Sequence, residues 1–357
     1  MKLYVGTYTR PAPYLAATNG KGLYVCEVDE ATGALEIEQE VPGIENPSYL
    51  CISPDGRNLH AVWEVFDWPE GLISSYRIDP ESGRLSYQGV HGTRGTVACY
   101  VMMDSQSRVA LVANYWSGTV TLFPARRDGA LSEAADVVQH TGSGPNEARQ
   151  EGPHAHSIVV APGDRFAIAA DLGADQLVVY RLDLGERKLI QHTTLDMPAG
   201  SGPRHFAFAP NGRTAYVICE LDSTMATLAW DAGTGTLTYV DRVAMLPEGV
   251  DHHHSHCADL AVHPTGRFVY GSNRGHDSIT MFRADPDTGR LTLLAHRSTE
   301  GKTPRNFTLT PDGRFLLVAN QDSDTVVTMP IDPVTGLLGE TASVAQVPSP
   351  NCVRFAP

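Results

Sequence analysis

The sequence lacks several features that would assign it to other classes of protein. No apolar run approaches the roughly eighteen residues of a membrane-spanning helix, so no membrane partner is expected. The six cysteines form no CxxC pair and have no short regular spacing, which favours reduced core residues over disulfides or zinc ligands. Basic residues number 27 against 41 acidic ones, so nucleic acid is not the expected partner either.

Motifs of two common types of catalytic site are missing as well. There is no GxSxG nucleophile motif, no P-loop, and no convincing nucleophile for Ser-His-Asp chemistry. The opening residues, MKLYVGTYTR, begin directly with strand-like alternation and carry no signal peptide, so the expected location is cytoplasmic. No window of about eleven residues holds a helical apolar period free of glycine and proline. The fold class is therefore predicted to be all-β with few helices.

Glycine and proline are plentiful and recur in two turn signatures. The first ends at Arg57, Arg165, Arg213, Arg267 and Arg314 (SPDGR, APGDR, APNGR, HPTGR, TPDGR), with a degraded copy, DSQSR, ending at Arg108. These arginines are 47 to 57 residues apart, which is the length of a four-stranded propeller blade. The second signature occurs at 29–35, 79–85, 231–237, 285–291 and 332–338, with weaker copies at 126–131 and 183–189. The second signature therefore has seven copies, and each repeat contains four short strand-like segments.

The two ends of the chain complete the count of repeats. The last residues, CVRFAP, match the first strand of a repeat, and KLYVGTY at residues 2–8 matches the second strand. We therefore predict one domain, residues 1–357, folded as a seven-bladed β-propeller with four antiparallel strands per blade. Pairing of the N- and C-terminal strands would close the ring and leave no open sheet edge.

Equivalent positions of the repeats carry most of the unusual polar residues. The residue that opens the first strand, beside the channel axis, is in turn Ser48, Cys99, His156, Arg204, Ala258, Arg305 and Asn351. The end of the second strand carries Glu64, Asn114, Asp171, Glu220, Asn273 with Arg274, and Asn320 with Gln321. Because these two positions meet at one rim of the channel, we predict that His156, Arg204, Glu220 and Arg274 are neighbours there. The three asparagines recur at one repeat position, which favours a structural role for them.

Several segments resemble the seven-bladed propeller lactonases, which include bacterial 6-phosphogluconolactonases and fungal carboxy-cis,cis-muconate cyclase. The resemblance covers essentially the whole chain and is clearest at 153–173, 202–223 (GPRHFAFAPNGRTAYVICELDS), 272–279 (SNRGHDSI), 303–324 and the end, NCVRFAP. It implies an active site made of a histidine, two arginines and a glutamate, here His156, Arg204, Arg274 and Glu220. It also implies lactone hydrolysis, most often of 6-phosphoglucono-1,5-lactone, without a metal or an organic cofactor.

These residue types suit the hydrolysis of a lactone. A neutral His156 could take the proton of an attacking water, and Arg204 or Arg274 could stabilise the oxyanion. Glu220 could orient these groups or act as the base itself, and His154, two residues from His156, is a further candidate for the base. The residues expected to contact a small anionic sugar lactone are His154, Arg305, Asp171, His256 and Asn320.

Alternative interpretations remain open from the sequence alone. The stretch DHHHSHC (251–257) invites a metal site, but consecutive histidines alternate across a strand, so a loop at the channel rim is preferred and no metal is expected. A lyase or cycloisomerase of the carboxymuconate cyclase type would need the same cations. A propeller that only binds a ligand is the third alternative, with the aromatic stretch WEVFDWPEG (63–71) as its candidate surface. Either a monomer or a homodimer is expected.

Overall fold

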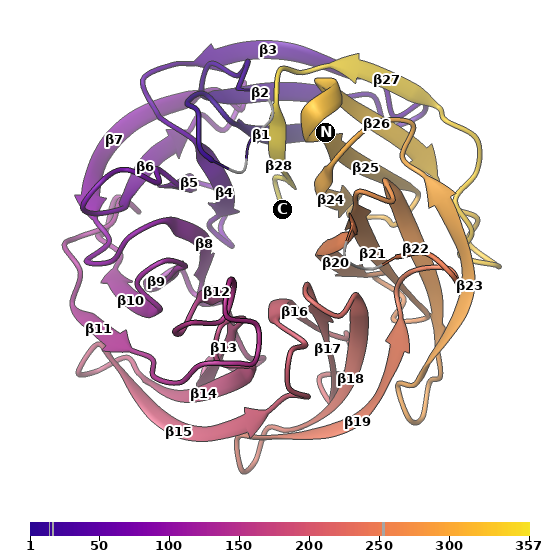
Figure 1. Ribbon diagram of the computed structural model, residues 1–357. Helices are drawn as coiled ribbons and strands as arrows, with labels where there is room; N and C mark the ends of the chain where they lie inside the picture. The colour runs from indigo at the N-terminus through magenta and orange to yellow at the C-terminus, as the bar shows by residue number, and fades with distance from the viewer. Residues whose placement is uncertain (14, 16–17, 252–253) are drawn as a thin grey trace.

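The protein is a closed ring of blades around a central channel. A computed structural model describes residues 1–13, 15, 18–251 and 254–357. The described residues form seven four-stranded antiparallel sheets arranged in a circle, which confirms the predicted seven-bladed propeller (Figure 1). The helical element η2 (Gln321–Ser323) is a single 3₁₀ turn. Among the described residues, no helix has the length and apolar character needed to cross a membrane.

Each blade runs outward from the channel in four strands. The inner strands are β4 (Pro47–Ile52), β8 (Ala98–Met103), β12 (Ala155–Val160), β16 (Pro203–Phe208), β20 (His256–Val262), β24 (Pro304–Leu309) and β28 (Pro350–Phe355). The second strands are β1 (Lys2–Thr7), β5 (Asn58–Trp63), β9 (Val109–Asn114), β13 (Phe166–Asp171), β17 (Thr214–Cys219), β21 (Phe268–Arg274) and β25 (Phe315–Asn320). The third strands are β2 (Leu23–Val28), β6 (Leu72–Ile78), β10 (Thr119–Pro124), β14 (Gln176–Asp183), β18 (Thr224–Asp231), β22 (Ser278–Ala284) and β26 (Thr325–Pro330). The outer strands are β3 (Leu35–Val41), β7 (Leu85–Gly92), β11 (Asp136–Gln139), β15 (Lys188–Asp196), β19 (Thr236–Ala244), β23 (Leu291–Ser298) and β27 (Ser343–Gln346).

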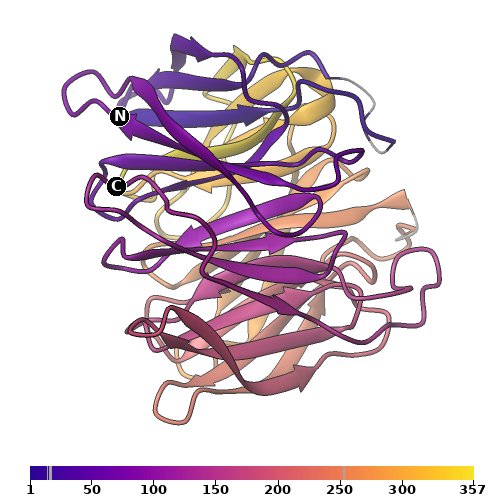
Figure 2. The same cartoon turned by 90° about the vertical axis from the view of Figure 1, so that its left-hand side faces the viewer.

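The ring is closed by strands from the two ends of the chain, as predicted. The C-terminal strand β28 pairs antiparallel with β1, with Val5 opposite Val353, and this sheet continues through β2 to β3. The closing strand gives the blade an inner strand that the N-terminal segment lacks. Both chain ends lie on the same side of the disc (Figure 2).

The recurrent turn glycines connect neighbouring blades. Gly289 and Gly336 have φ of 71° and 76°, in the left-handed region that favours glycine. Their carbonyl oxygens accept hydrogen bonds of 2.9 Å from the buried hydroxyls of Tyr216 and Tyr270 in the adjacent blades. A Cβ at Gly336 would lie 2.3 Å from a ring atom of Phe268, so a side chain does not fit there. The repeat glycines therefore set both the turn and the contact between blades.

A β-bulge near the start of the inner strands shapes the channel. The pairing of β4, β16 and β24 shifts by one residue directly after the opening proline. Side chains normally alternate between the faces of a strand, but a bulge allows two successive residues to point the same way. Both residues of each resulting pair line the centre of the channel: Ser48 with Tyr49, Arg204 with His205, and Arg305 with Asn306. The bulge thus places two layers of side chains across the channel.

The cysteines do not form disulfides. All six are unpaired; five are buried and Cys51 is half-buried. The burial of five of them agrees with the sequence prediction of cysteines in the core.

Candidate active site

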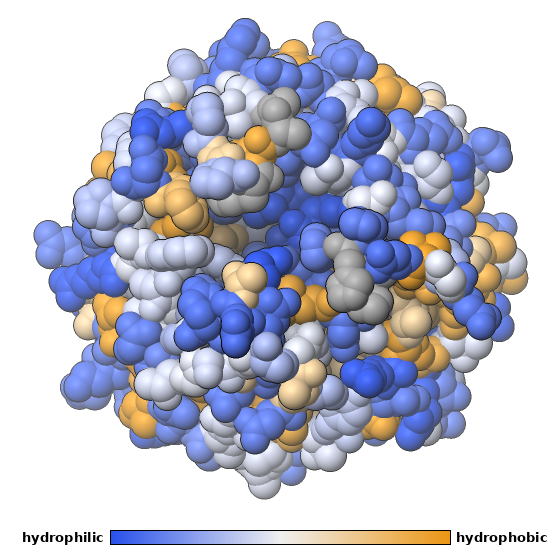
Figure 3. All heavy atoms as spheres, viewed as in Figure 1, coloured by the Kyte–Doolittle hydropathy of each residue, from blue (hydrophilic) through white to orange (hydrophobic). Residues whose placement is uncertain are grey.

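A cavity of about 540 Å³ opens at one mouth of the channel. In the space-filling view, this mouth is a hollow with hydrophilic residues at its floor (Figure 3). Its wall includes residues from the starts of the inner strands and from just beyond the ends of the second strands. The charged, histidine and aromatic residues that line it are Glu64, Phe66, Tyr115, Trp116, Arg149, Glu151, His154, His156, Glu220, His254, His256, Arg274, Arg305 and Asp322.

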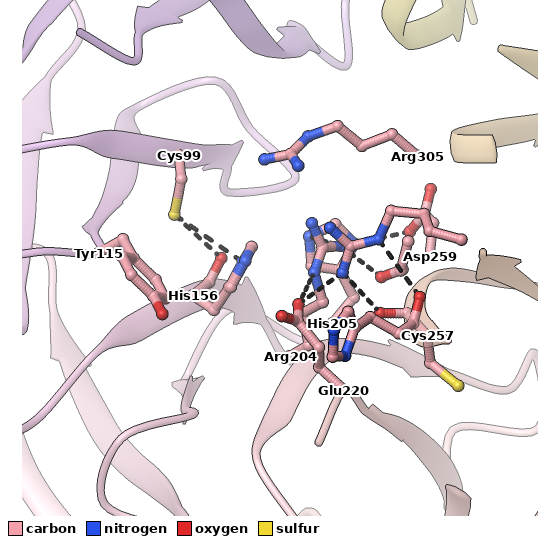
Figure 4. A network of polar contacts seen from close by, with 12 residues as sticks. Cys99, Tyr115, His156, Arg204, His205, Glu220, Cys257, Asp259 and Arg305 are labelled. Carbon is pink, nitrogen blue, oxygen red and sulfur yellow. Dashed lines mark hydrogen bonds and ion pairs between the residues drawn. The ribbon is translucent and has the colours of Figure 1, made fainter. Parts of the chain in front are cut away.

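The carboxylate of Glu220 is shared by three arginines at the floor of this cavity. Its Oε1 lies 2.6 Å from Nη2 of Arg149, and its Oε2 lies 2.9 Å from Nε of Arg204 and 2.8 Å from Nη2 of Arg274. Burial alone would raise the pKa of Glu220, but the charges of Arg274, Arg149 and Arg204 hold it well below its usual value. Glu220 is therefore an ionised anchor for the three guanidinium groups, and Figure 4 shows it beside Arg204.

Arg149 is a site residue that the repeat pattern did not predict. It lies in the long connection between β11 and β12, outside the two repeat positions used to choose candidates. Besides Glu220, its Nη2 also donates to the hydroxyl of Tyr115 at 3.3 Å. The inter-blade connection therefore adds a third cation to the arginine cluster.

His156 lies on the cavity wall beside this cluster. Its Nδ1 is 3.9 Å from Sγ of Cys99, and none of the described residues forms a hydrogen bond with its Nε2. Burial, and then the nearby charge of Arg204, hold the pKa of His156 well below its usual value. The imidazole is thus neutral at pH 7 and can accept a proton.

His154 is held differently from His156. Its Nδ1 is 3.1 Å from the carbonyl oxygen of Tyr115, and its Nε2 is 3.1 Å from Oε1 of Glu151. Its ring also stacks on the ring of Tyr115 at 4.6 Å. Both ring nitrogens are occupied, so His154 shapes the wall of the cavity.

Arg204 and Arg305 approach the centre of the channel from different blades (Figure 4). Arg204 is only 2% exposed and does not line the large cavity, because its Nη1 donates to the carbonyl of Ala258 beneath the floor. Arg305 does line the cavity; its Nη2 is 3.4 Å from Oε1 of Glu64, and its guanidinium lies 5.3 Å from the ring centre of Tyr8. The structure therefore brings His156, Glu220, Arg274 and Arg305 to one wall and places Arg204 behind it.

Two of the residues expected to contact substrate are directed away from the cavity. Oδ1 of Asp171 accepts the backbone N–H groups of His154 and Ala174, at 2.8 and 2.9 Å, while its Oδ2 is 2.6 Å from Nδ1 of His140. Nδ2 of Asn320 donates to the carbonyl of Thr299 at 2.9 Å. Neither residue lines the cavity, so the structure assigns both to the framework.

The described histidines of the 251–257 segment lie at the rim, as the preferred interpretation required. His254 and His256 both line the cavity, while His252 and His253 lie outside the described residues. Within the described part of the chain, no group of three or more histidine, cysteine, aspartate or glutamate side chains is arranged to hold a metal ion.

The aromatic stretch 63–71 also contributes to the cavity. Phe66 lines it together with Trp116, and their ring centres are 5.2 Å apart. This placement supports the role of a loop that shapes the pocket.

A comparison with protein families assigns the chain. The family model described as lactonase, 7-bladed beta-propeller, matches residues 2–355. The chain belongs to this lactonase family. It is 35% identical over 354 residues to the 6-phosphogluconolactonase of Bacillus subtilis, covering 99% of this chain and 97% of that protein. It is 31% identical to the 6-phosphogluconolactonase of Formosa agariphila, covering 86% of each chain.

A solved structure is similar to this chain over its whole length. The periplasmic gluconolactonase PpgL of Pseudomonas aeruginosa superposes with a TM-score of 0.91 and 34% sequence identity, and the match covers 100% of this chain and 99% of that one. Relatives of this chain therefore include proteins named for a phosphorylated lactone and one named for gluconolactone.

The charges on the wall of the cavity are of both signs. Three arginines line the cavity within the described residues, namely Arg149, Arg274 and Arg305. Four carboxylates line it as well: Glu64, Glu151, Glu220 and Asp322. Because each of these arginines has a carboxylate of Glu220 or Glu64 within 3.4 Å, the site can orient a polar substrate through paired charges.

Proposed function

We propose that the protein hydrolyses the lactone of a six-carbon sugar acid, with 6-phosphoglucono-1,5-lactone as the leading substrate. The observation that carries this proposal is the placement of the neutral His156 and the charged Arg274 on the wall of one cavity in a member of the lactonase family. A lactone is a cyclic ester, so its hydrolysis needs a base for the water and a cation for the oxyanion.

His156 is the proposed general base. The tautomer with hydrogen on Nδ1 directs that hydrogen at Sγ of Cys99 and leaves a lone pair on Nε2, which no described residue occupies. Glu220 is less suited to this role, since three arginines bind its two oxygens. His154 is also less suited, because both of its ring nitrogens already have partners.

Arg274 is the proposed oxyanion donor. Its Nε and Nη2 donate to backbone carbonyls of His256 and Cys257, at 3.3 and 3.1 Å, and Nη2 also contacts Glu220. Burial lowers the pKa of Arg274 to about 10 against the opposing effect of Glu220, so the group stays charged at pH 7. No described residue accepts from Nη1, and this nitrogen is the donor available to a substrate.

The proposed reaction then proceeds through a tetrahedral intermediate. Water attacks the carbonyl carbon while His156 takes one proton, and the negative charge on the carbonyl oxygen is stabilised by Arg274. The ring C–O bond breaks, and the proton returns from His156 to the departing ring oxygen. The products are one hydroxyl group and one carboxylic acid, which ionises at neutral pH.

The unphosphorylated lactone is the second candidate substrate. The carboxylates on the cavity wall favour it, because each arginine that lines the cavity already has a carboxylate partner at 2.6–3.4 Å. A phosphate dianion would have to compete for these guanidinium groups with Glu220 and Glu64. The similarity to a gluconolactonase points in the same direction.

A substrate panel with matched variants tests the proposal. The purified protein is assayed with 6-phosphoglucono-1,5-lactone and with glucono-1,5-lactone, and spontaneous hydrolysis is subtracted. We expect His156→Ala and Arg274→Ala to lower kcat/KM at least about tenfold, equivalent to about 1.4 kcal/mol in the barrier. Arg165→Ala is the control, since Arg165 lies in an exposed turn between β12 and β13. Unchanged kinetics in both site variants, or no hydrolysis of either lactone, would contradict the proposal.

A further inference from the structure

A second cavity of about 540 Å³ lies at the opposite mouth of the channel. It is formed by the later residues of the inner strands and by the turns that follow them, on the side of the disc where both chain ends lie (Figure 2). The central void between the two cavities measures only about 10 Å³. A ligand in the second cavity is therefore separate from a substrate in the first.

The polar floor of the second cavity comes from the residues that follow the bulge. These residues directly succeed the ring that contains His156 and Arg204, and they include Tyr49, Tyr100, His205 and Asp259. Nδ1 of His205 is 2.7 Å from Oδ1 of Asp259. The rings of Tyr49 and Tyr100 stack at 4.0 Å, and the His205 ring meets both edge-on. These contacts hold the side chains of the floor in one arrangement and make it a polar surface.

Arg354 supplies the positive charge of this floor. Its guanidinium lies 4.5 Å from the ring centre of Tyr49, and its Nη1 donates to Oδ1 of Asn306 at 3.1 Å and to the carbonyl of Val353 at 2.8 Å. Nη2 is 4.0 Å from Oδ2 of Asp259, and it forms no hydrogen bond to any described residue. One edge of the guanidinium is thus left to bind an acceptor.

Both oxygens of the Asp259 carboxylate on the floor are already occupied. Oδ1 of Asp259 accepts from His205 and from the backbone N–H of Leu260, and its Oδ2 accepts from Nδ2 of Asn306. What the floor offers to a ligand is therefore a donor with a positive charge. The side walls are largely apolar and include Met102, Val160, Phe206, Phe208, Leu260 and Phe307.

We propose that this second cavity binds a small organic carboxylate, with its carboxylate on Arg354 and its apolar body along the walls. Arginine binds carboxylates through paired N–H donors, and small-molecule sites combine apolar walls with a few polar groups. The volume is within the range of ordinary ligand sites. The proposal is independent of the reaction at the other mouth.

Benzoate is the probe for the experiment, and benzyl alcohol is its neutral counterpart. Binding is measured by titration calorimetry on the full chain. Wild-type protein should bind benzoate saturably and at least about tenfold more tightly than benzyl alcohol, as expected for a charged hydrogen-bonded pair. Arg354→Gln should weaken benzoate binding by at least about tenfold. Arg305→Gln, which changes an arginine at the other mouth, should leave the affinity unchanged.

A second variant tests the location without touching Arg354. Met102→Trp adds bulk to the cavity wall and should abolish benzoate binding while thermal melting remains cooperative. If Arg354→Gln does not fold, the proposal is tested by Met102→Trp and by the comparison of benzoate with benzyl alcohol. Absence of saturable binding to wild-type protein, equal affinity for the two probes, or loss of binding in Arg305→Gln would overturn the proposal.

Discussion

Replacing Glu220 by glutamine is the most direct test of the arginine cluster. The change keeps the size of the side chain but removes the charge shared by Arg149, Arg204 and Arg274. Arg204 is buried, and breaking a buried ion pair costs about 3–5 kcal/mol because the remaining charge has no partner. The pairs with Arg149 and Arg274 share the same carboxylate, so their loss is part of this cost and is not added to it. We expect Glu220→Gln to lower the free energy of unfolding at pH 7 by about 3–5 kcal/mol.

The assay is urea unfolding followed by tryptophan fluorescence. Glu151→Gln is the matched control, because the Glu151 carboxylate pairs with His154 but is 50% exposed, so its loss should cost at most about 1 kcal/mol. The folded-state pKa of Glu220 is depressed, so its contribution is complete above the unfolded-state pKa of about 4.3 and is lost as the pH falls through the folded-state value. The difference between wild type and Glu220→Gln should therefore be constant from about pH 5 to 8 and shrink in stronger acid. A variant as stable as wild type at pH 7 would refute the reasoning.

Three further predictions concern the site and its framework. The pKa of His156 is held well below its usual value, so kcat/KM for the lactone should show no inflection near pH 6.5. The measurement uses buffers from pH 5 to 8, with spontaneous hydrolysis subtracted. A midpoint at about pH 6.5 would contradict this prediction. Asn320→Ala should lower the melting temperature, with a loss of about 1–3 kcal/mol, yet leave kcat/KM unchanged; a fall in kcat/KM would place Asn320 in the site. Iodoacetamide should leave the activity of the folded protein intact, because burial raises the pKa of Cys99 and keeps it a thiol. Inactivation in step with alkylation of Cys99 would contradict this prediction.

The repeat register predicted the ring of side chains at the centre of the channel. Of the seven positions predicted to open the inner strands, six line the small central void: Ser48, Cys99, His156, Arg204, Arg305 and Asn351. The period of the turns and the matching chain ends were sufficient for this, because every blade repeats one backbone geometry. How deeply a long side chain reaches into the channel was not predictable from the repeat. Arg204 bends beneath the floor to reach the carbonyl of Ala258, a contact that depends on the neighbouring blade.

At the ends of the second strands, the prediction combined two successive positions that have different roles. Asn320 and Asp171 are the last residues of β25 and β13, opposite Pro304 and Ala155. Glu220 lies one residue beyond the end of β17, so its side chain takes the other direction. A shift of one residue reverses the face of a strand, which explains why Glu220 reaches the cavity and Asn320 does not. Arg149 could not be predicted in this way, because it lies in the connection between β11 and β12 and not at a strand end.

The bulge after the opening residue of the inner strands gives the channel its two chemically different ends. The first residues of the pairs, such as Arg204 and Arg305, lie on the side of the candidate active site, and the second residues Tyr49 and His205 belong to the floor of the opposite cavity. Nε2 of His205 lies 3.2 Å from Nη1 of Arg204, so the two layers touch. Burial, and then the charge of Arg204, lower the pKa of His205 to about 4, so it meets this guanidinium as a neutral acceptor. A strand without the bulge would turn one of the two side chains away from the channel, and the buried arginine would lose its support from below.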